Sequence, residues 1–255
     1  MPRKLDPGAV AHARRLVRDL RIRRAAEIDI ELIAAHLNIL VRRVPLQLEE
    51  GRLLRTASHG IINVAEGAYS SNKWRFVIAH EIGHFLRHPR DDSFEACTHG
   101  DLSNYVGTDR EAQANDFAAE LLMPESLFEK ACDRNRPCLR DVAELADEFQ
   151  ISLTATALRF VRFAPEPCAV VHSTTGSVDW VDWSSTFRPA IRRKTKLDTR
   201  TYAGDIFAGK AVEDRPSQVD ADAWSDSPWA ADLDLFEHSR RVSSTSVLTF
   251  LWHAS

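Results

Sequence analysis

One segment of the sequence reads Trp74-Arg75-Phe76-Val77-Ile78-Ala79-His80-Glu81-Ile82-Gly83-His84-Phe85-Leu86. It contains the pattern H-E-x-x-H. Residues four apart on an α-helix differ by about 40° around its axis, so the two imidazoles point the same way. Such a pair can bind one tetrahedral zinc ion, and the intervening glutamate can reach a water at that metal. The spacing therefore predicts His80 and His84 as zinc ligands and Glu81 as the catalytic carboxylate.

The residues around this pattern argue for a metal rather than for two chance histidines on a solvated helix. Apolar side chains surround the predicted helix of residues 73–86 on nearly every side, so it should be buried. Ser71 or Asn72 is expected to cap it, and Pro89 to end it. Two histidines and a carboxylate buried without partners would be costly, and a bound metal removes that cost.

A catalytic zinc needs a third protein ligand and one open position. The metzincin continuation requires glycine and then histidine after the motif, but Arg87 and Arg90 occupy those positions. The other common arrangement takes a glutamate from a later helix, and Glu111 offers one. Asn115, one turn further along, is placed to hydrogen-bond a ligating side chain.

Two alternatives to Glu111 as ligand remain open. The pattern Thr108-x-x-Glu111 is also a capping box, in which the glutamate only reaches back to the helix cap. The other candidates for the third ligand are His88, Cys97, His99 and Asp101. Glu111 is preferred to the cap reading because the site otherwise lacks a third donor.

The composition is that of an ordinary globular protein. The 255 residues are 44% hydrophobic and carry a formal net charge of −4, which gives no reason to expect general affinity for nucleic acid or anionic membranes. The first residues lack the apolar core of a secretory signal, and no apolar run is long enough to span a bilayer. The four cysteines form no C-x-x-C pair and are expected to be free thiols in the cytoplasm.

Two segments carry a family resemblance. RFVIAHEIGHFLRHP (residues 75–89) and EAQANDFAAELLMP (residues 111–124) resemble the ImmA/IrrE metallo-endopeptidases, and the clear likeness runs from about residue 29 to 124. The resemblance implies Zn²⁺ bound by His80, His84 and Glu111, with Glu81 catalytic. It also implies an intracellular peptidase whose substrate is a helix-turn-helix repressor, so that cleavage induces a stress or mobile-element response.

The fold class expected is α+β. A mostly helical, zincin-like peptidase domain with a small β-hairpin or sheet should cover residues 1–125. A helical pair should follow at 126–164, and an α/β, strand-rich region of unknown role at 165–255. The expected helices cover residues 7–24, 29–37, 73–86, 109–123, 139–149 and 153–163. The expected strands cover residues 51–56, 60–64, 169–172, 177–181 and 241–252, and residues 88–109 should form a loop.

Substrate binding can be placed only in outline. The strand Ile61–Val64 is a candidate for pairing with an extended substrate segment. His99 and Tyr105, in the loop between the ligand helices, are candidates for stabilising the oxyanion. Nothing in the sequence indicates the oligomeric state.

Two other functional classes compete with a peptidase. Residues 142–161 resemble a helix-turn-helix, but acidic residues on the first helix would repel phosphate, so direct DNA binding is not expected. A partner-binding regulator with a zinc site and little peptidase activity is the other possibility. Glu81 argues against it, because zinc binding alone needs no glutamate there.

Overall fold

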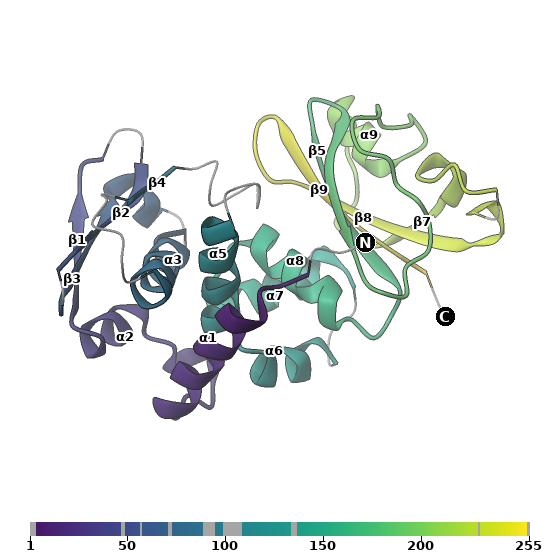
Figure 1. The fold of residues 1–255 in the computed structure, drawn as a ribbon. Helices are drawn as coiled ribbons and strands as arrows, with labels where there is room; N and C mark the ends of the chain where they lie inside the picture. Colours follow the sequence, from purple (N-terminus) through teal and green to yellow (C-terminus); the bar gives the residue numbers. More distant parts are fainter. Residues whose placement is uncertain are drawn as a thin grey trace. The chain divides into compact units, whose positions relative to one another are not determined.

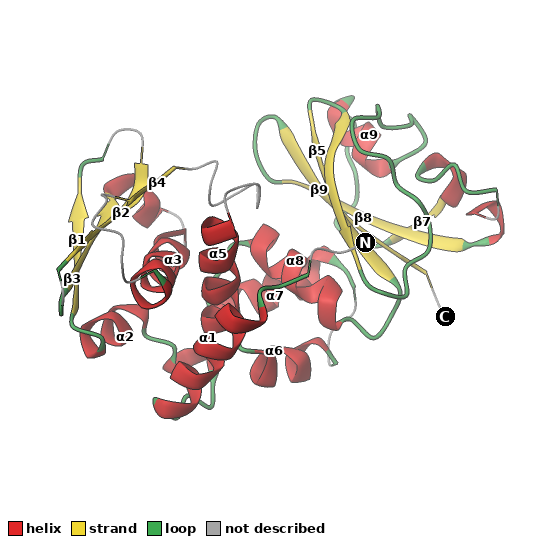
Figure 2. Ribbon diagram, viewed as in Figure 1, coloured by secondary structure: helices red, strands yellow, loops and turns green. Residues whose placement is uncertain are grey.

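The computed structural model describes residues 4–46, 49–56, 58–70, 73–88, 95–98, 109–133, 137–228 and 230–253. The chain divides into two compact units, which are considered separately (Figures 1 and 2). The N-terminal unit comprises Arg3–Leu127 and Glu148–Ser152, and the C-terminal unit contains Phe128–Asp147 and Leu153–Ser255. Both helices and sheets are present, which confirms the α+β class.

The N-terminal unit combines a four-stranded sheet with helices. Its strand order is β1-β3-β2-β4, in which β3 pairs with β1 in parallel and with β2 in antiparallel fashion. The elements are α1 (Pro7–Asp19), η1 (Ala25–Glu27), α2 (Ile30–His36), β1 (Ile39–Val44), β2 (Glu49–Arg55), β3 (Gly60–Ala65), η2 (Glu66–Ser70), α3 (Lys73–Arg87), β4 (Glu95–Thr98) and α5 (Asp109–Leu122). The expected hairpin of β2 and β3 is confirmed.

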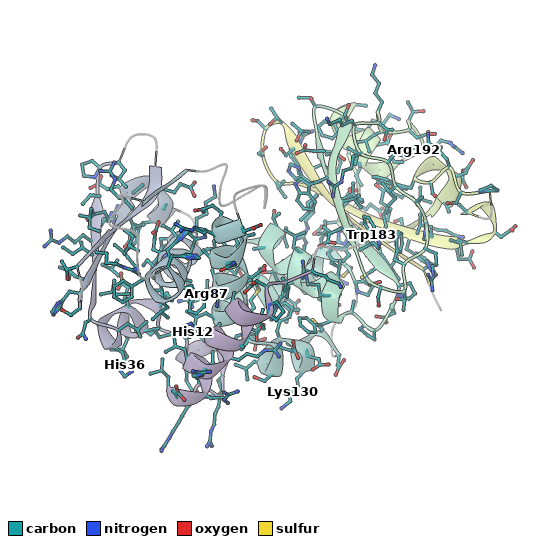
Figure 3. All side chains as sticks on the ribbon, in the orientation of Figure 1. His12, His36, Arg87, Lys130, Trp183 and Arg192 are labelled. Atoms are coloured by element: carbon teal, nitrogen blue, oxygen red, sulfur yellow. The ribbon has the colours of Figure 1, made fainter. Side chains whose placement is uncertain are left out.

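Helix α3 packs against the sheet through β2 and β3, and against α5. The approach to α5 is close at Gly83, where an added Cβ atom would lie 3.1 Å from the Cα of Ala114. Arg87, labelled in Figure 3, ties the end of α3 to both α5 and the start of α1. Its guanidinium donates to Gln113 Oε1 at 3.0 Å and to Asp6 Oδ1 at 3.1 Å. These contacts fix the two helices that carry the predicted metal ligands.

Strand β2 also holds the C-terminal end of α3. The guanidinium of Arg55 donates to the backbone oxygens of His88 at 2.6 Å and His84 at 3.1 Å, and also to that of Phe85. The last carbonyls of a helix have no partners within it, and a cation is favourable there. Arg55 supplies both partners and charge, so the end of α3 is anchored to the sheet.

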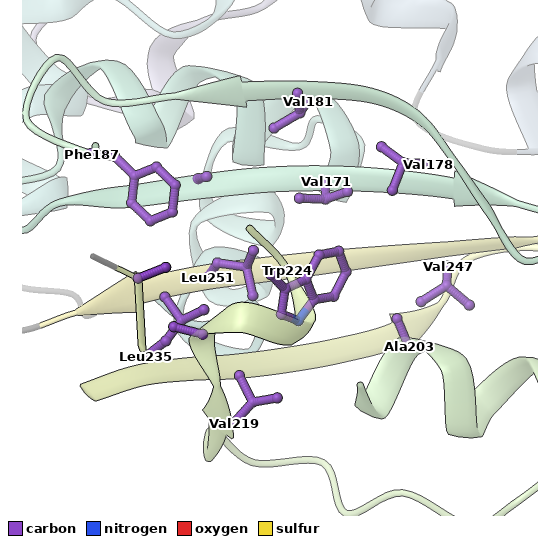
Figure 4. Packing of buried hydrophobic residues seen from close by; sticks show 13 residues of the cluster. Val171, Val178, Val181, Phe187, Ala203, Val219, Trp224, Leu235, Val247 and Leu251 are labelled. Carbon is purple, nitrogen blue, oxygen red and sulfur yellow. The ribbon is translucent and has the colours of Figure 1, made fainter. Parts of the chain in front are cut away.

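The elements from Glu125 onward are α6 (Glu125–Cys132), α7 (Leu139–Phe149), α8 (Leu153–Phe163), β5 (Cys168–Thr174), β6 (Ser177–Trp183), α9 (Tyr202–Phe207), β7 (Ser217–Asp220), η3 (Ala221–Ala223), η4 (Ala230–Asp232), β8 (Asp234–Arg241) and β9 (Ser246–His253). The strands form an antiparallel sheet in the order β6-β5-β9-β8-β7. Val171, Leu251, Phe187 and Trp224 belong to the buried cluster of this unit (Figure 4).

Three expectations about single elements are wrong, and some elements were missed. The first helix ends at Asp19 rather than at residue 24, because Arg21 adopts a left-handed backbone conformation with φ of 55°. The final strand expected at residues 241–252 is β9, which begins only at Ser246, and its antiparallel partner β8 was not expected. Residues 88–109 are not all loop, since they include β4, and the short helix α6 was not expected. The bounds of α7 and α8 are confirmed.

Within the described ranges, no helix combines the length and the apolar character that crossing a bilayer requires.

Candidate metal centre

Helix α3 brings the two histidines of the motif together in a buried place. His80 is fully buried and His84 is 1% exposed. Their Nε2 atoms lie 3.0 Å apart, with ring centroids 4.7 Å apart. The prediction that both imidazoles point the same way is therefore confirmed.

Glu111 completes the group from α5. Its Oε2 lies 3.1 Å from His80 Nε2, and its Oε1 lies 3.2 Å from His84 Nε2. His80, His84 and Glu111 form a group that could hold a metal ion, with ligand atoms all within 4.8 Å of one another. Ligand atoms around a tetrahedral zinc with bonds of 2.0–2.2 Å lie roughly 3.3 Å apart, so the group has a suitable size and chemistry.

The environment of Glu111 suits a ligand. Burial would raise the pKa of its carboxyl group, but the hydrogen bonds to His80 and His84 outweigh burial and hold that pKa well below its usual range. The carboxyl group is therefore ionised, as metal binding requires. Its side chain is 20% exposed, so the group is open to solvent on this side. Thr108, the capping partner in the alternative reading, lies outside the described residues.

Asn115 fixes the orientation of His80. The two side chains meet at 2.9 Å between His80 Nδ1 and Asn115 Oδ1. Because a carboxamide oxygen only accepts hydrogen bonds, His80 donates from Nδ1 to Asn115, and the proton that metal binding would remove is the one on Nε2, which faces Glu111. This arrangement is the usual support of a metal-binding histidine. Asn115 is fully buried, in agreement with the supporting role predicted for it.

Glu81 lies next to this group but is not part of it. It is fully buried, on the side of α3 that faces β2. An added Cβ atom at Gly51 of β2 would come within 2.9 Å of Glu81 Oε1. Sequence reasoning missed Gly51, although a glycine inside a strand often marks a close approach.

Of the other candidate ligands, only the side chain of His88 lies within the described part of the structure. The ring centroid of His88 lies 5.3 Å from that of His84, but His88 does not join the group. Burial, then the charges of His84, Arg110 and Arg87, lower the pKa of His88 to about 4, so its ring is neutral at pH 7. The side chain of Cys97 in β4, and the residues His99, Asp101 and Tyr105, lie outside what the structure describes.

The proposed pairing of substrate with Ile61–Val64 is wrong. This segment forms β3, which is hydrogen-bonded to β1 along one edge and to β2 along the other. Both rows of backbone donors and acceptors are therefore occupied, and no extended segment can add to this strand.

The chain is similar to known metallopeptidases, as the metal-binding group would suggest. A family model described as the IrrE N-terminal-like domain, of a metallopeptidase family, matches residues 34–161. The match covers half of the chain and includes all the residues of the metal group, and the chain belongs to this family. The resemblance to the ImmA/IrrE peptidases is thereby confirmed.

One curated relative is the radiation response metalloprotease IrrE of Deinococcus radiodurans. It is 26% identical over 171 residues, which cover 66% of this chain and 51% of the relative. The chain thus matches about half the length of that relative.

A likeness of fold extends over nearly the whole chain. A transcriptional regulator of Mycobacterium tuberculosis superposes with a TM-score of 0.61 at 16% identity. The match covers 98% of this chain and 89% of the regulator. At this identity the comparison establishes a shared fold and not a shared activity.

Proposed function

We propose that this protein is a zinc-dependent metallo-endopeptidase. The observation that carries the proposal is the meeting of His80, His84 and Glu111 from two helices, with Glu81 buried beside them. Membership of a metallopeptidase family supports it. Three protein ligands would leave a bound zinc one open position, as catalytic zinc sites require.

His80 and His84 would hold zinc through Nε2, and Glu111 through its carboxylate, with Asn115 keeping His80 in the required tautomer. Bound zinc would lower the pKa of a water towards neutrality and polarise the carbonyl of the scissile bond. The 20% exposure of the Glu111 side chain supports an approach of the peptide from that side.

Glu81 moves the proton in this mechanism. Its carboxylate would accept a proton from the attacking water and deliver it to the nitrogen of the leaving amine. Its burial excludes bulk water from that transfer and keeps the carboxylate in one place. The residue that stabilises the oxyanion is not assigned, since His99 and Tyr105 lie outside the described residues.

The proposed substrate is a cytoplasmic helix-turn-helix repressor, whose cleavage would induce a stress or mobile-element response. The family resemblance supports this, and the relative that is named for a radiation response is consistent with it. The proposal is tested by co-expressing the protein with a candidate helix-turn-helix repressor and following the repressor by mass spectrometry. A discrete pair of fragments is the expected result.

A DNA-binding regulator is the second candidate, because the superposed transcriptional regulator shares the fold. The expected second helix of a helix-turn-helix is α8, but its cations are engaged within the C-terminal unit. Arg159 is 4% exposed and its guanidinium lies 4.8 Å from the ring centroid of Phe163. Arg162 lies 3.8 Å from Asp182 Oδ2. On α7, Glu144 and Asp147 are exposed and would repel phosphate.

We therefore expect the purified protein to show no sequence-specific affinity for duplex DNA. The measurement is a gel shift or footprint on its own promoter, with Arg159→Ala/Arg162→Ala as the paired variant. A protected site that disappears in the variant would instead favour the regulator.

A further inference from the structure

Gly51 lies in the interior of β2, directly against the helix that carries the motif. It pairs with Val64 of β3 on one side and with Cys97 of β4 on the other. Alternate residues of a strand share a face. Leu53, two positions on, is 5% exposed, and Arg55, four positions on, binds the end of α3. The face of β2 that packs against α3 therefore carries Gly51, Leu53 and Arg55.

The strand is irregular just before Gly51. Pairing between β2 and β4 steps from Glu49–Thr98 to Gly51–Cys97, so Glu50 is an extra residue in β2. Bulges of this kind often adjoin active sites, where they change the direction of a side chain or strand. Glu50 Oε1 also lies 3.4 Å from the ammonium of Lys73, the first residue of α3. The ion pair links the bulge to the start of α3.

A side chain at Gly51 would meet two atoms of α3. Its Cβ would lie 2.5 Å from Val77 Cγ1 and 2.9 Å from Glu81 Oε1. Both separations are shorter than real Cβ contacts. Gly51 does not have a positive φ, so its backbone conformation accepts an L-residue. What requires glycine at this position is the space taken by the two helix side chains.

The two contacts have different consequences. Valine on a helix has one strongly preferred χ1 rotamer, so Val77 resists displacement and an alanine at position 51 would strain the packing. The Glu81 carboxylate is the end of a longer side chain and can shift. It would have to move by about 0.5 Å to reach an ordinary contact distance. The contact with Val77 therefore lowers the stability of the fold, and the contact with Glu81 displaces its carboxylate.

We propose that Gly51 is a positioning residue: because it has no side chain, it leaves the space in which the Glu81 carboxylate lies. The effect on cleavage rests on the proposed function, because it requires Glu81 to be the proton carrier. A misplacement of about 1 Å can cost roughly a hundredfold in rate, so a shift half as large is expected to cost about tenfold.

The test compares wild type, Gly51→Ala, Val77→Ala and Gly51→Ala/Val77→Ala. Gly67→Ala is the matched control, because an added Cβ there meets nothing within 4 Å. Each protein is measured for Tm, zinc content and cleavage of the co-expressed repressor, and crystal structures locate Glu81. Gly51→Ala should lower Tm by roughly 2–10 °C through Val77, keep its zinc and cleave about tenfold more slowly.

The double variant separates positioning from packing. Without the Val77 methyl groups, adding Gly51→Ala should not lower Tm below that of Val77→Ala. Cleavage by the double variant should remain slow, because the contact with Glu81 remains. The crystal structure should show the carboxylate displaced by about 0.5 Å. The proposal would be overturned if the double variant recovered full cleavage together with its Tm, or if the Glu81 carboxylate had not moved. If wild type cleaves nothing, the proposed function fails, while the position of Glu81 in the crystals still decides the role of Gly51.

Discussion

Glu81→Gln should slow cleavage of the repressor by at least about a hundredfold while the protein stays folded and keeps its zinc. Glutamine preserves the shape and hydrogen-bonding reach of the side chain but cannot accept a proton, and proton transfer typically contributes 10²–10⁴-fold. Because Glu81 lies outside the metal group, its replacement should leave zinc content unchanged. Binding of the partner should also persist.

The measurement is co-expression of the repressor with each variant, followed by mass spectrometry of the repressor and elemental analysis of the protein. Glu66→Gln, an exposed glutamate in η2, is the matched control and should cleave like wild type. If wild type and Glu81→Gln relieve repression equally, and neither yields a fragment, the protein acts by binding. The proposal of a peptidase would then be abandoned in favour of a partner-binding regulator.

Glu111→Ala should weaken zinc binding by at least about tenfold, the lower end for disturbing a metal site. The change leaves two imidazoles and removes the anionic ligand. The loss appears in a competition titration against a chromophoric chelator. Asp109→Ala is the matched control, since it removes an exposed carboxylate from the first turn of the same helix. Full zinc retention in Glu111→Ala, together with zinc loss in His99→Ala, would assign the third ligand to His99.

The helices of the site could be predicted because their signals are local. The H-E-x-x-H spacing alone places His80 and His84 on one side of α3, and the regular apolar pattern gave α7 and α8 their observed bounds. The link from α3 to Glu111 needed more, because it depends on how two helices pack. It was suggested by family resemblance and by the need for a third donor.

Strands were predicted less well, because their partners are distant and some carry charges. Arg42 and Arg43 interrupt the apolar pattern of β1, whose parallel partner β3 lies some 20 residues on. In β8, Glu237 and His238 are buried but polar. Glu237 accepts hydrogen bonds from Trp224 Nε1 at 2.8 Å and from the Ala203 backbone at 2.7 Å. These polar side chains are buried only because the tertiary structure supplies their hydrogen-bond partners. The sequence of β8 therefore lacks the apolar pattern by which a buried strand is predicted.

The supporting residues of the site were the least predictable. Gly51 and Arg55 act through the register of β2 along α3, and that register depends on a bulge at Glu50. A glycine in a strand and an arginine near its end are common in sequences. Only their placement against Glu81 and against the last carbonyls of α3 gives them a role.

The proposed mechanism depends on zinc binding by His80, His84 and Glu111. The most direct test is a crystal structure of the zinc-loaded wild-type protein with anomalous data on both sides of the zinc absorption edge. We expect one strong anomalous peak, at about 2.0–2.2 Å from both Nε2 atoms and from a carboxylate oxygen of Glu111. A peak elsewhere, or a zinc bound to the histidines with Glu111 turned away and another residue in its place, would contradict it.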